Sequence, residues 1–254
     1  MNPPTVSVCM IAQNEGGRIG KAVESVRWAD EVVVIDGGST DGTVEEARGA
    51  GAKVLEIPWP GNFAEQIVRS VDATTGEWVF RLDADEVVTG ELARQIRSTV
   101  EKPDAVDGYR VRRRNRFLGR WIRHGGWWPD PQLRLVRREC VCVRGAPGHE
   151  TLHMDGVPGN LTGALEHDTH PTLAASFSRV ARYSEHLGPD RARRKRIRPV
   201  HLVAHPAAAF LRKFVVQSGW RDGVHGFLIA GIHSMVKFAV YARAWDIQRE
   251  ESSR

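Results

Sequence analysis

The first hundred residues alternate between short apolar runs and segments of helical periodicity, and this alternation restricts the fold more than any other feature. We expect buried strands at 6–11, 31–35, 53–57 and 78–82. Helices are expected after them, at 18–28, 43–48, 62–71 and 90–100. Thr89 is positioned to cap the last of these helices. Strands that alternate with helices predict an α/β domain with a mostly parallel sheet flanked by helices.

The rest of the chain is less regular. Further strands are expected at 108–116, 132–136 and 140–143. A loop rich in tryptophan and glycine, 121–131, suits either a substrate platform or a well-packed connection. After Pro171 the pattern is helical, with one apolar face in 224–245. We therefore divide the chain into 1–170, with halves 1–100 and 101–170, and a C-terminal helical region, 171–254.

Charge and composition restrict the partners. The net charge of +5 favours an anionic partner: nucleic acid, nucleotide phosphates or anionic lipid. Basic stretches lie at 110–114 and 191–198, but no nucleic-acid-binding motif accompanies them, so no nucleic acid is expected. The three cysteines form no CxxC pair, which favours a reducing cytoplasm over a disulfide framework or zinc site.

Targeting and membrane signals are weak in this sequence. The N-terminus does not resemble a signal peptide. The longest apolar run, 227–240, is interrupted by His233 and Lys237 and is shorter than the roughly 20 residues that cross a bilayer. We therefore expect no transmembrane segment. The C-terminal helices are expected either on an anionic membrane surface, on the α/β domain or on a second subunit.

Polar side chains follow three of the first four expected strands. Asn14 and Glu15 follow the first, Asp36 the second, and Asp83 and Asp85 the fourth. Ligands of parallel α/β sheets bind at the carboxyl ends of the strands, so these groups are expected on one rim. Two carboxylates beside a diphosphate suit Mg²⁺ or Mn²⁺. Solvated turns or helix caps are the alternatives, and a cap is the preferred interpretation of Asp41.

Several segments carry a family resemblance. The segments AQNE at 12–15, DGGSTDGT at 36–43 and LDADE at 82–86 resemble family 2 glycosyltransferases, which are inverting enzymes of the GT-A (Rossmann-like) fold. Residues 108–128, with FLG at 117–119 and WIRHGGW at 121–127, resemble the branch of lipopolysaccharide-core β-glucosyltransferases. So do Asp130, QLRL at 132–135 and HE at 149–150. The likeness covers about 5–170 well and the C-terminal helices more loosely.

The resemblance implies roles for the donor half, 1–100. Asp36 is expected to contact the nucleobase and Asp83 the ribose or diphosphate. Asn14 and Glu15 would line the nucleotide pocket, and Asp85 would bind a divalent metal, Mg²⁺ or Mn²⁺. Relatives usually carry Lys or Arg and then Asn after a glutamine such as Gln66, whereas this chain has Ile67 and Val68. A polar contribution to the donor site is missing there.

The acceptor half, 101–170, would supply the chemistry. Glu150 is the expected catalytic base, and Asp130 is the second candidate. His167 is a candidate ligand of the metal or diphosphate, or else a structural histidine. Gln132 and Arg134 are candidates for the acceptor or the donor phosphate, although Arg134 can equally pair with a carboxylate in the core.

We therefore expect a metal-dependent hexosyltransferase that uses a nucleoside diphosphate sugar, UDP-linked, and a cell-envelope glycolipid or polysaccharide acceptor, as in lipopolysaccharide biosynthesis. It would be cytoplasmic or peripheral on the inner face of the cytoplasmic membrane. Two other classes remain open: a non-catalytic protein that binds sugar nucleotides or glycans, and a nucleotidyltransferase.

Overall fold

The computed structural model describes residues 3–145, 150–170 and 172–252. The chain forms two compact units. The first, which we call the sheet unit, comprises Met1–Arg113 and Pro131–His167; the second, the helical unit, comprises Arg114–Asp130 and Asp168–Arg254. The loop 114–130 thus groups with the C-terminal helices, although the sequence division had placed it in the acceptor half.

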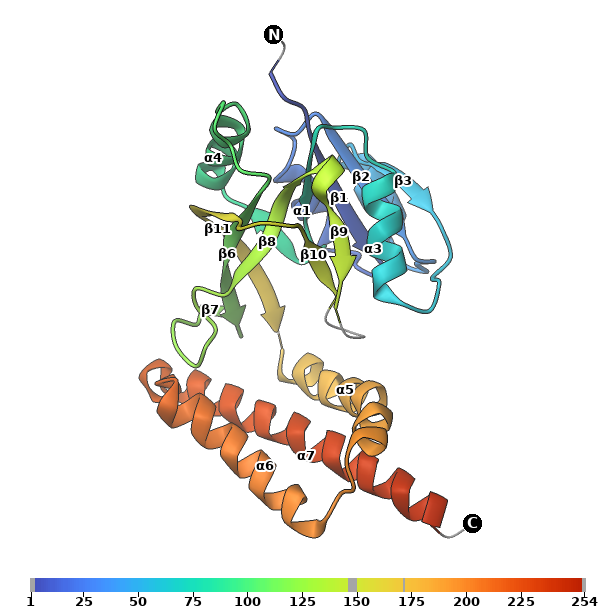
Figure 1. Cartoon of the computed structure of the whole chain (residues 1–254), viewed down its shortest axis with the longest axis vertical. Helices are drawn as coiled ribbons and strands as arrows, with labels where there is room; N and C mark the ends of the chain where they lie inside the picture. Colours follow the sequence, from blue (N-terminus) through green and yellow to red (C-terminus); the bar gives the residue numbers. More distant parts are fainter. Residues whose placement is uncertain (1–2, 146–149, 171, 253–254) are drawn as a thin grey trace. The chain divides into compact units, whose positions relative to one another are not determined.

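Four strands of the sheet unit run parallel. They lie in the order β3-β2-β1-β4. Their bounds are β1 Val6–Ala12, β2 Glu31–Asp36, β3 Lys53–Glu56 and β4 Trp78–Arg81. All four were expected from their apolar runs, and the sheet order brings the ends of β1, β2 and β4 to one edge (Figure 1).

Antiparallel strands extend this sheet beyond β4. In the described part of the chain it has nine strands, and its order continues β8-β6-β11-β5, with β7 on β6. Their bounds are β5 Glu86–Val88, β6 Gly108–Phe117, β7 Arg120–Trp121, β8 Pro131–Arg137 and β11 Gly159–His170. Two short strands, β9 Cys142–Arg144 and β10 Thr151–His153, pair separately.

Helices cover both faces of the parallel strands. They are α1 Ile19–Glu24, α2 Thr43–Gly49, α3 Phe63–Asp72 and α4 Gly90–Val100. Because side chains alternate along a strand, Val8 and Met10 of β1 pack with α1, α2 and α4, whereas Cys9 packs with Ile67 and Val71 of α3. The expected α/β fold with a C-terminal helical extension is confirmed.

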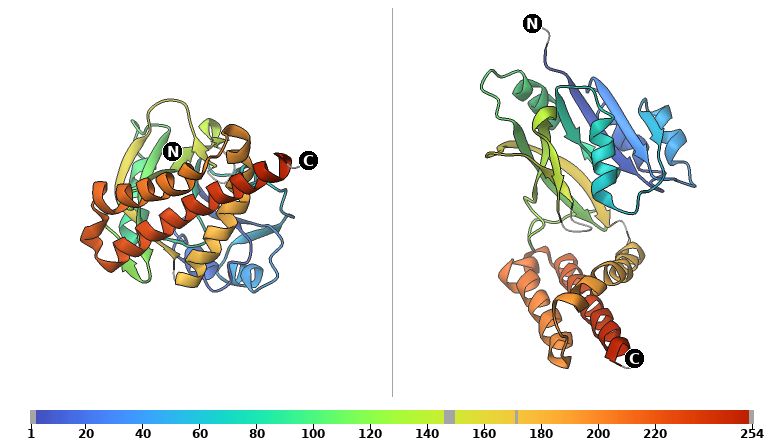
Figure 2. Two further views of the ribbon diagram at one scale, coloured as in Figure 1. Left: turned by 90° about the horizontal axis from the view of Figure 1, so that it is seen from below. Right: turned by 45° about the vertical axis from the view of Figure 1, so that its right-hand side comes forward.

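The helical unit contains three long helices. These are α5 Leu173–Arg194, α6 Pro199–Leu211 and α7 Val224–Ser252, with short turns η2 Arg212–Val216 and η3 Gly219–Asp222 between α6 and α7. Both α5 and α6 pack on α7, and α6 runs beside it in Figures 1 and 2. From the loop 114–130, Phe117 and Ile122 pack against Ile229 of α7.

Helix α7 is longer than the apolar run in the sequence. Among the described residues it alone is long and apolar enough to cross a bilayer, by length and composition only, and 28% of the relevant window is buried. The sequence expectation of no such segment considered only 227–240, whereas the helix continues to Ser252.

Candidate active site

The loops after β1 and β2 are joined by hydrogen bonds. Asn14 has a left-handed backbone, with φ 57°. Its side-chain Oδ1 accepts from the Thr40 amide at 2.9 Å, and its own amide donates to Ser39 Oγ at 2.8 Å. The Glu15 amide donates to Thr43 Oγ1 at 2.8 Å. The predicted nucleotide-pocket residues Asn14 and Glu15 therefore lie against the loop that Asp36 begins.

Asp36 organises this loop. Its side chain is buried, and Oδ2 accepts from the amides of Gly38 at 2.9 Å and Ser39 at 2.8 Å. Ser39 Oγ donates to Oδ1 at 2.5 Å. Asp41 accepts from the Thr43 amide at 3.0 Å and from the Gly16 amide at 3.1 Å, which agrees with its interpretation as a turn and cap residue.

Asp83 lies between two arginines. Arg134 Nη2 donates to Asp83 Oδ2 at 2.6 Å and to Glu86 Oε1 at 2.6 Å. Arg81 Nη2 donates to Asp83 Oδ1 at 3.0 Å. Arg113 adds a longer ion pair to Glu86, at 3.4 Å. Three guanidinium groups and two carboxylates thus form one network, and of the two roles considered for Arg134, the pairing with a carboxylate is the one observed.

The network keeps Asp83 and Arg134 ionised. Burial alone would raise the pKa of the Asp83 carboxyl, but the guanidinium of Arg134, followed by that of Arg81, holds this pKa well below its usual range. Burial alone would lower the pKa of Arg134, but Asp83 and Glu86 raise it above its ordinary value. A rim of fixed charges results, and it places arginine side chains beside Asp83, where a diphosphate is expected.

Asp85 and His167 are neighbours. Strand β5 pairs with β11 so that Glu86 lies opposite His167, and His167 Nε2 is 3.3 Å from Asp85 Oδ2. Among the described residues no group of three or more His, Cys, Asp or Glu side chains is arranged to hold a metal ion. The pair would offer one carboxylate oxygen and one imidazole nitrogen to a divalent cation whose other ligands came from a diphosphate.

Glu150 lies close to the same network. Its main-chain oxygen accepts from Arg81 Nη1 at 3.5 Å, so this residue and Asp83 contact the same guanidinium. Gln132 lies on β8, opposite Val111 of β6.

Asp130 belongs to the helical unit, where its Oδ2 accepts from Asn115 Nδ2 at 3.0 Å. His149, quoted with Glu150 in the resemblance, lies outside the described residues.

The sequence interpretation gave no role to Arg81, Glu86 or Arg113. Glu86 was quoted within LDADE, and its complete burial beside two arginines shows that it holds the network together. The signal for Arg81 was a charge directly after the apolar run of β4. Arg113 lay within the basic stretch 110–114, and nothing in that stretch distinguished it from its neighbours.

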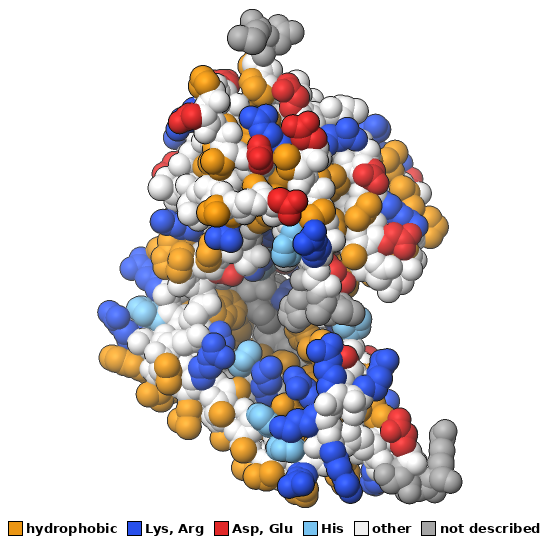
Figure 3. All heavy atoms as spheres, in the orientation of Figure 1, with side chains coloured by type: hydrophobic (Ala, Val, Ile, Leu, Met, Phe, Trp, Pro, Cys, Tyr) orange, Lys and Arg blue, Asp and Glu red, His pale blue; other side chains and the backbone are white. Residues whose placement is uncertain are grey.

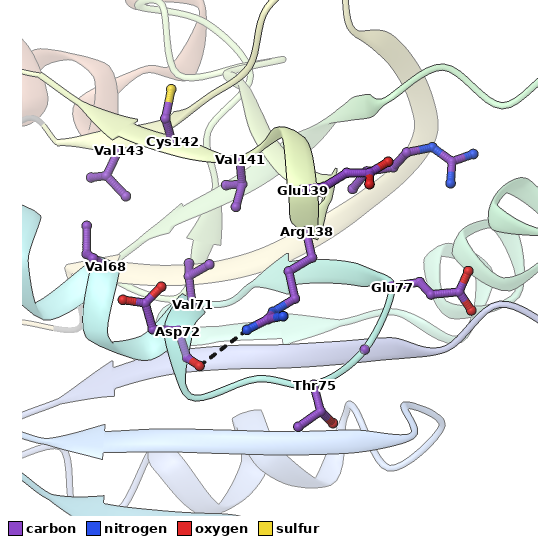
Figure 4. Close-up of a pocket in the computed structure, with 12 residues that line it drawn as sticks. Val68, Val71, Asp72, Thr75, Glu77, Arg138, Glu139, Val141, Cys142 and Val143 are labelled. Atoms are coloured by element: carbon purple, nitrogen blue, oxygen red, sulfur yellow. Dashed lines mark hydrogen bonds between the residues drawn. The ribbon is translucent and has the colours of Figure 1, made fainter.

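A separate cavity of about 490 Å³ lies elsewhere in the sheet unit (Figure 4). Its lining comes from α3, the segment before β4, and the region from Arg137 to Val143. Glu77 of the lining precedes β4, whereas Asp83 follows that strand, so the cavity lies at the other end of β4. It contains none of the predicted site residues. The candidate site is therefore the charged rim, by which we mean the network of Arg81, Asp83, Glu86, Arg113 and Arg134 together with the neighbouring pair Asp85 and His167.

Comparison with models of protein families shows which family this chain belongs to. The model of glycosyl transferase family 2 matches residues 7–152, which include every residue of the charged rim except His167. The chain belongs to this family. The resemblance seen in the sequence is thereby confirmed.

Two curated relatives match this glycosyltransferase over nearly its whole length. The lipopolysaccharide core biosynthesis glycosyltransferase LpsC of Rhizobium meliloti is 29% identical over 253 residues, covering 94% of this chain and 92% of the relative. An uncharacterized glycosyltransferase of Rickettsia prowazekii is 26% identical over 271 residues, covering 95% and 87%.

Other relatives match a shorter part. Glucosyl-3-phosphoglycerate synthase of Mycolicibacterium smegmatis is 39% identical over 93 residues, which span 31% of that relative. Among solved structures, the Mycobacterium tuberculosis glucosyl-3-phosphoglycerate synthase with Mn²⁺, UDP and glucosyl-3-phosphoglycerate aligns with a TM-score of 0.49 at 21% identity, covering 66% of this chain and 73% of that one.

Proposed function

We propose that this glycosyltransferase is an inverting, metal-dependent enzyme that transfers a hexose from a UDP-linked sugar to a cell-envelope glycolipid or polysaccharide. The observation that carries the proposal is the charged rim of the sheet unit. There Asp83 follows β4, Asp85 precedes β5, His167 lies on the neighbouring strand β11, and arginines balance the acids. The name of LpsC supports an acceptor in the lipopolysaccharide core.

The donor would lie across this rim. Asp36, with Asn14 and Glu15, would contact the nucleoside, and Asp83 the ribose or diphosphate. Asp85 and His167 would hold Mg²⁺ or Mn²⁺, which when bound neutralises charge on the departing diphosphate. Arg81 and Arg134 fix the orientation of Asp83 through their ion pairs.

Glu150 is the proposed base. Its carboxylate would take the proton of the acceptor hydroxyl while the hydroxyl oxygen bonds to the anomeric carbon. The bond from that carbon to the diphosphate breaks on the opposite face, so the configuration inverts and the nucleoside diphosphate leaves. Asp130 is the second candidate for the base.

Two substitutions test these roles. Asp85→Ala is expected to abolish metal-stimulated release of UDP from UDP-glucose and related sugars while the fold is kept. Glu150→Gln should lose roughly 10²-fold or more in transfer and keep UDP binding, because a general base contributes about that much. Asp155→Asn, an exposed acid in the same unit, is the matched control.

Particular outcomes would contradict the proposal. Full activity of Asp85→Ala rejects the metal role, and unchanged turnover of Glu150→Gln moves the base to Asp130 or elsewhere. Release of pyrophosphate would indicate a nucleotidyltransferase. Tight UDP binding without turnover on any acceptor would indicate a non-catalytic binding protein.

A peripheral membrane location is the second part of the proposal, and helix α6 supports it. Every exposed position from 200 to 211 is apolar, at helical spacing: Val200, Val203, Ala204, Ala207, Ala208 and Leu211. The apolar surface continues with Val215, Val216 and Trp220, of which Trp220 is 58% exposed. A helix with such a stripe, beside an exposed tryptophan, is typical of proteins that lie in the membrane interface.

Basic side chains border this apolar surface. Lys195, Arg196 and Arg198 precede α6, and Arg212 and Arg221 follow it, all of them exposed. Figure 3 shows hydrophobic and basic side chains next to one another on the helical unit. This combination suits the anionic inner face of the cytoplasmic membrane, where each basic residue near the surface adds about 1 kcal/mol.

Vesicle sedimentation tests the membrane proposal. The full chain is expected to sediment with phosphatidylglycerol-containing vesicles and less with pure phosphatidylcholine. Val203→Asp with Leu211→Asp should abolish this, whereas Val157→Asp, which changes an 86% exposed valine of the sheet unit, should not. Equal binding of all variants rejects the surface, and a stable dimer that Leu211→Asp dissociates would assign it to a second copy.

A further inference from the structure

Two histidines of α6 lie beside a buried tyrosine of α7. His201 and His205 are one helical turn apart, and their ring centroids are 5.5 Å apart. The ring of His205 stacks on that of Tyr241 at 4.4 Å, and the ring of His201 lies 6.3 Å from it. The guanidinium of Arg191, from α5, lies over the Tyr241 ring at 5.2 Å. Side chains of all three long helices thus meet around one aromatic ring.

Positive charges surround these rings. Burial lowers the pKa of His205 below its ordinary value, and the charges of Lys195, Arg191 and Lys237 lower it further. Burial, followed by the charge of Lys195, also lowers the pKa of His201. Lys195 therefore acts on both rings, and the neighbourhood of the two histidines is cationic.

The acids of the same helices do not balance this charge. Asp190 of α5 pairs with the exposed Arg194 at 2.9 Å, and Asp246 of α7 pairs with two exposed arginines at 3.0 and 3.2 Å. Over the residues that the structure describes, no ion pair reaches Arg191, Lys195 or Lys237. Figure 3 shows histidine side chains among basic ones on the helical unit. Like charges gathered in this way repel one another and attract an anion.

Both histidines are able to donate hydrogen bonds to such an anion. His201 Nδ1 accepts from the Arg198 amide at 3.0 Å, so the neutral ring carries its proton on Nε2. Both side chains are only half-buried. Histidines at this spacing can also bind a metal ion, but the surrounding cations would repel one. The cluster therefore suits an anion.

We propose that His201, His205 and Lys195, with Arg191 and Lys237 beside them, form a binding site for a phosphate monoester. A terminal phosphate carries about two negative charges at neutral pH and has three oxygens that accept hydrogen bonds. Ammonium, guanidinium and imidazole groups are its usual donors. A phosphodiester has about one charge and fewer free oxygens, so it would use fewer of these donors.

The site borders the apolar stripe of α6. His201 and His205 directly follow Val200 and Ala204, which belong to the stripe. A lipid headgroup and a phosphorylated saccharide offer the same phosphate chemistry at this place. The inference goes beyond the proposed function, because it assigns a ligand to the helical unit and requires neither sugar transfer nor a metal.

Vesicles of matched surface charge test the inference on the full chain. Binding to vesicles with phosphatidic acid, a monoester, should be roughly tenfold tighter than to vesicles with phosphatidylglycerol, a diester, because more charge-assisted hydrogen bonds form. Lys195→Met removes an exposed charge, and His205→Phe keeps an aromatic ring on Tyr241; each should abolish this preference. Arg196→Met, which removes an equal charge from the same exposed segment, should keep it.

Inorganic phosphate in solution distinguishes the two sources of the ligand. Broadening of its phosphorus NMR signal by the native chain, reduced in Lys195→Met but not in Arg196→Met, would show that a phosphate group alone suffices, as on a phosphorylated saccharide. A Lys195-dependent preference that appears only with vesicles would assign the site to a lipid headgroup.

Three outcomes overturn the inference. In the first, the native chain binds both kinds of vesicle equally and shows no phosphate signal that depends on Lys195. In the second, Lys195→Met keeps the preference, whatever the ring exchange at His205 does to the packing. In the third, Arg196→Met loses it as well, so that any positive charge suffices. None of these outcomes bears on sugar transfer, and a chain that transfers no sugar could still show the preference.

Discussion

At the scale of single residues, Arg134 connects two of the three carboxylates of the LDADE segment, Asp83 and Glu86. Its Nη2 is 2.6 Å from both Asp83 and Glu86, and its side chain is 4% exposed. Buried ion pairs are weak contributors when both partners can be replaced, but they are costly to break from one side. The stability of the charged rim therefore depends strongly on Arg134.

Arg134→Met tests this dependence. It should lower the free energy of unfolding by about 3 kcal/mol, because Glu86 is left buried with only the longer pair to Arg113. Adding Glu86→Gln should recover part of the loss by removing the uncompensated charge. Urea unfolding measures both, and Arg138→Met, an exposed neighbour, should change stability by less than about 0.5 kcal/mol. Strict additivity of the two substitutions would contradict the network.

The acids at the strand ends could be found from sequence, but their partners could not. Asp36, Asp83 and Asp85 follow apolar runs, and this position can be recognised in the sequence. The pairing of Asp83 with Arg134 needs β8 antiparallel to β4, as in the register of Phe80 with Leu135. No local periodicity specifies that register, so the arginine network appears only in three dimensions.

At the scale of elements, the helix cap expected at Thr89 is confirmed. Its Oγ1 accepts from the Leu92 amide at 3.2 Å and donates to the Ala164 oxygen of β11 at 3.2 Å. One hydroxyl therefore caps α4 and ties it to β11.

Thr89→Ala should cost about 1 to 2 kcal/mol of stability, since both hydrogen bonds are lost. Thr89→Ser retains the hydroxyl and should lose much less. Chemical denaturation measures the difference, and equal losses in the two variants would show that the methyl group, rather than the cap, matters.

Strand β11 was missed for a physical reason. Glycine weakens a strand by local propensity, and β11 contains Gly159 and Gly163. A Cβ atom on Gly163 would lie 2.9 Å from the Leu92 Cα, so the close approach of α4 requires glycine at this place. The packing of α4 therefore requires glycine in β11, although glycine lowers the strand propensity by which a strand is predicted from sequence.

Helix α7 contains a histidine that makes the helical unit sensitive to acid. Burial, together with Lys213, Lys237 and Arg212, lowers the pKa of His233 to about 4. The unfolded chain, with a histidine pKa of about 6.5, takes up this proton first. The contribution of neutral His233 to the free energy of unfolding is therefore fully present above about pH 6.5, and it is lost as the pH falls towards 4.

His233→Gln should flatten this decline, because glutamine does not titrate. The thermal midpoint between pH 7 and pH 4.5 measures it, with His153→Gln, an exposed histidine of the sheet unit, as control. His201 and His205, whose pKa values are also lowered by burial, keep the same slope in both variants. A decline in His233→Gln as steep as in the native chain would exclude His233 as the cause.

At the scale of the whole molecule, the units are not consecutive in sequence. The chain passes from the sheet unit to the helical unit after Arg113, returns at Pro131 and leaves again after His167. The boundary expected near residue 170 lies close to the last passage. The boundaries after Arg113 and at Pro131 could not be predicted, because the sequence of 114–130 does not show with which unit its apolar side chains pack.

A fragment of residues 1–170 tests this organisation. It keeps Phe117 and Ile122 but lacks Ile229, against which they pack, so apolar surface is exposed. We expect the fragment to aggregate or bind a hydrophobic dye, and Phe117→Ser with Ile122→Thr should improve its solubility. Size-exclusion chromatography decides the matter; a monodisperse native fragment with cooperative unfolding would contradict the prediction.

The split loop also has a consequence for recombination. A chimaera that exchanges everything after residue 170 between two relatives would join a foreign α7 to a resident 114–130 segment, and the small core around Phe117, Ile122 and Ile229 would be mismatched. The segment 114–130 and the C-terminal helices must therefore be exchanged together. A substitution in 114–130 that alters this small core should favour a compensating substitution in α7. Relatives that differ in the helical unit should therefore show paired substitutions at positions more than a hundred residues apart.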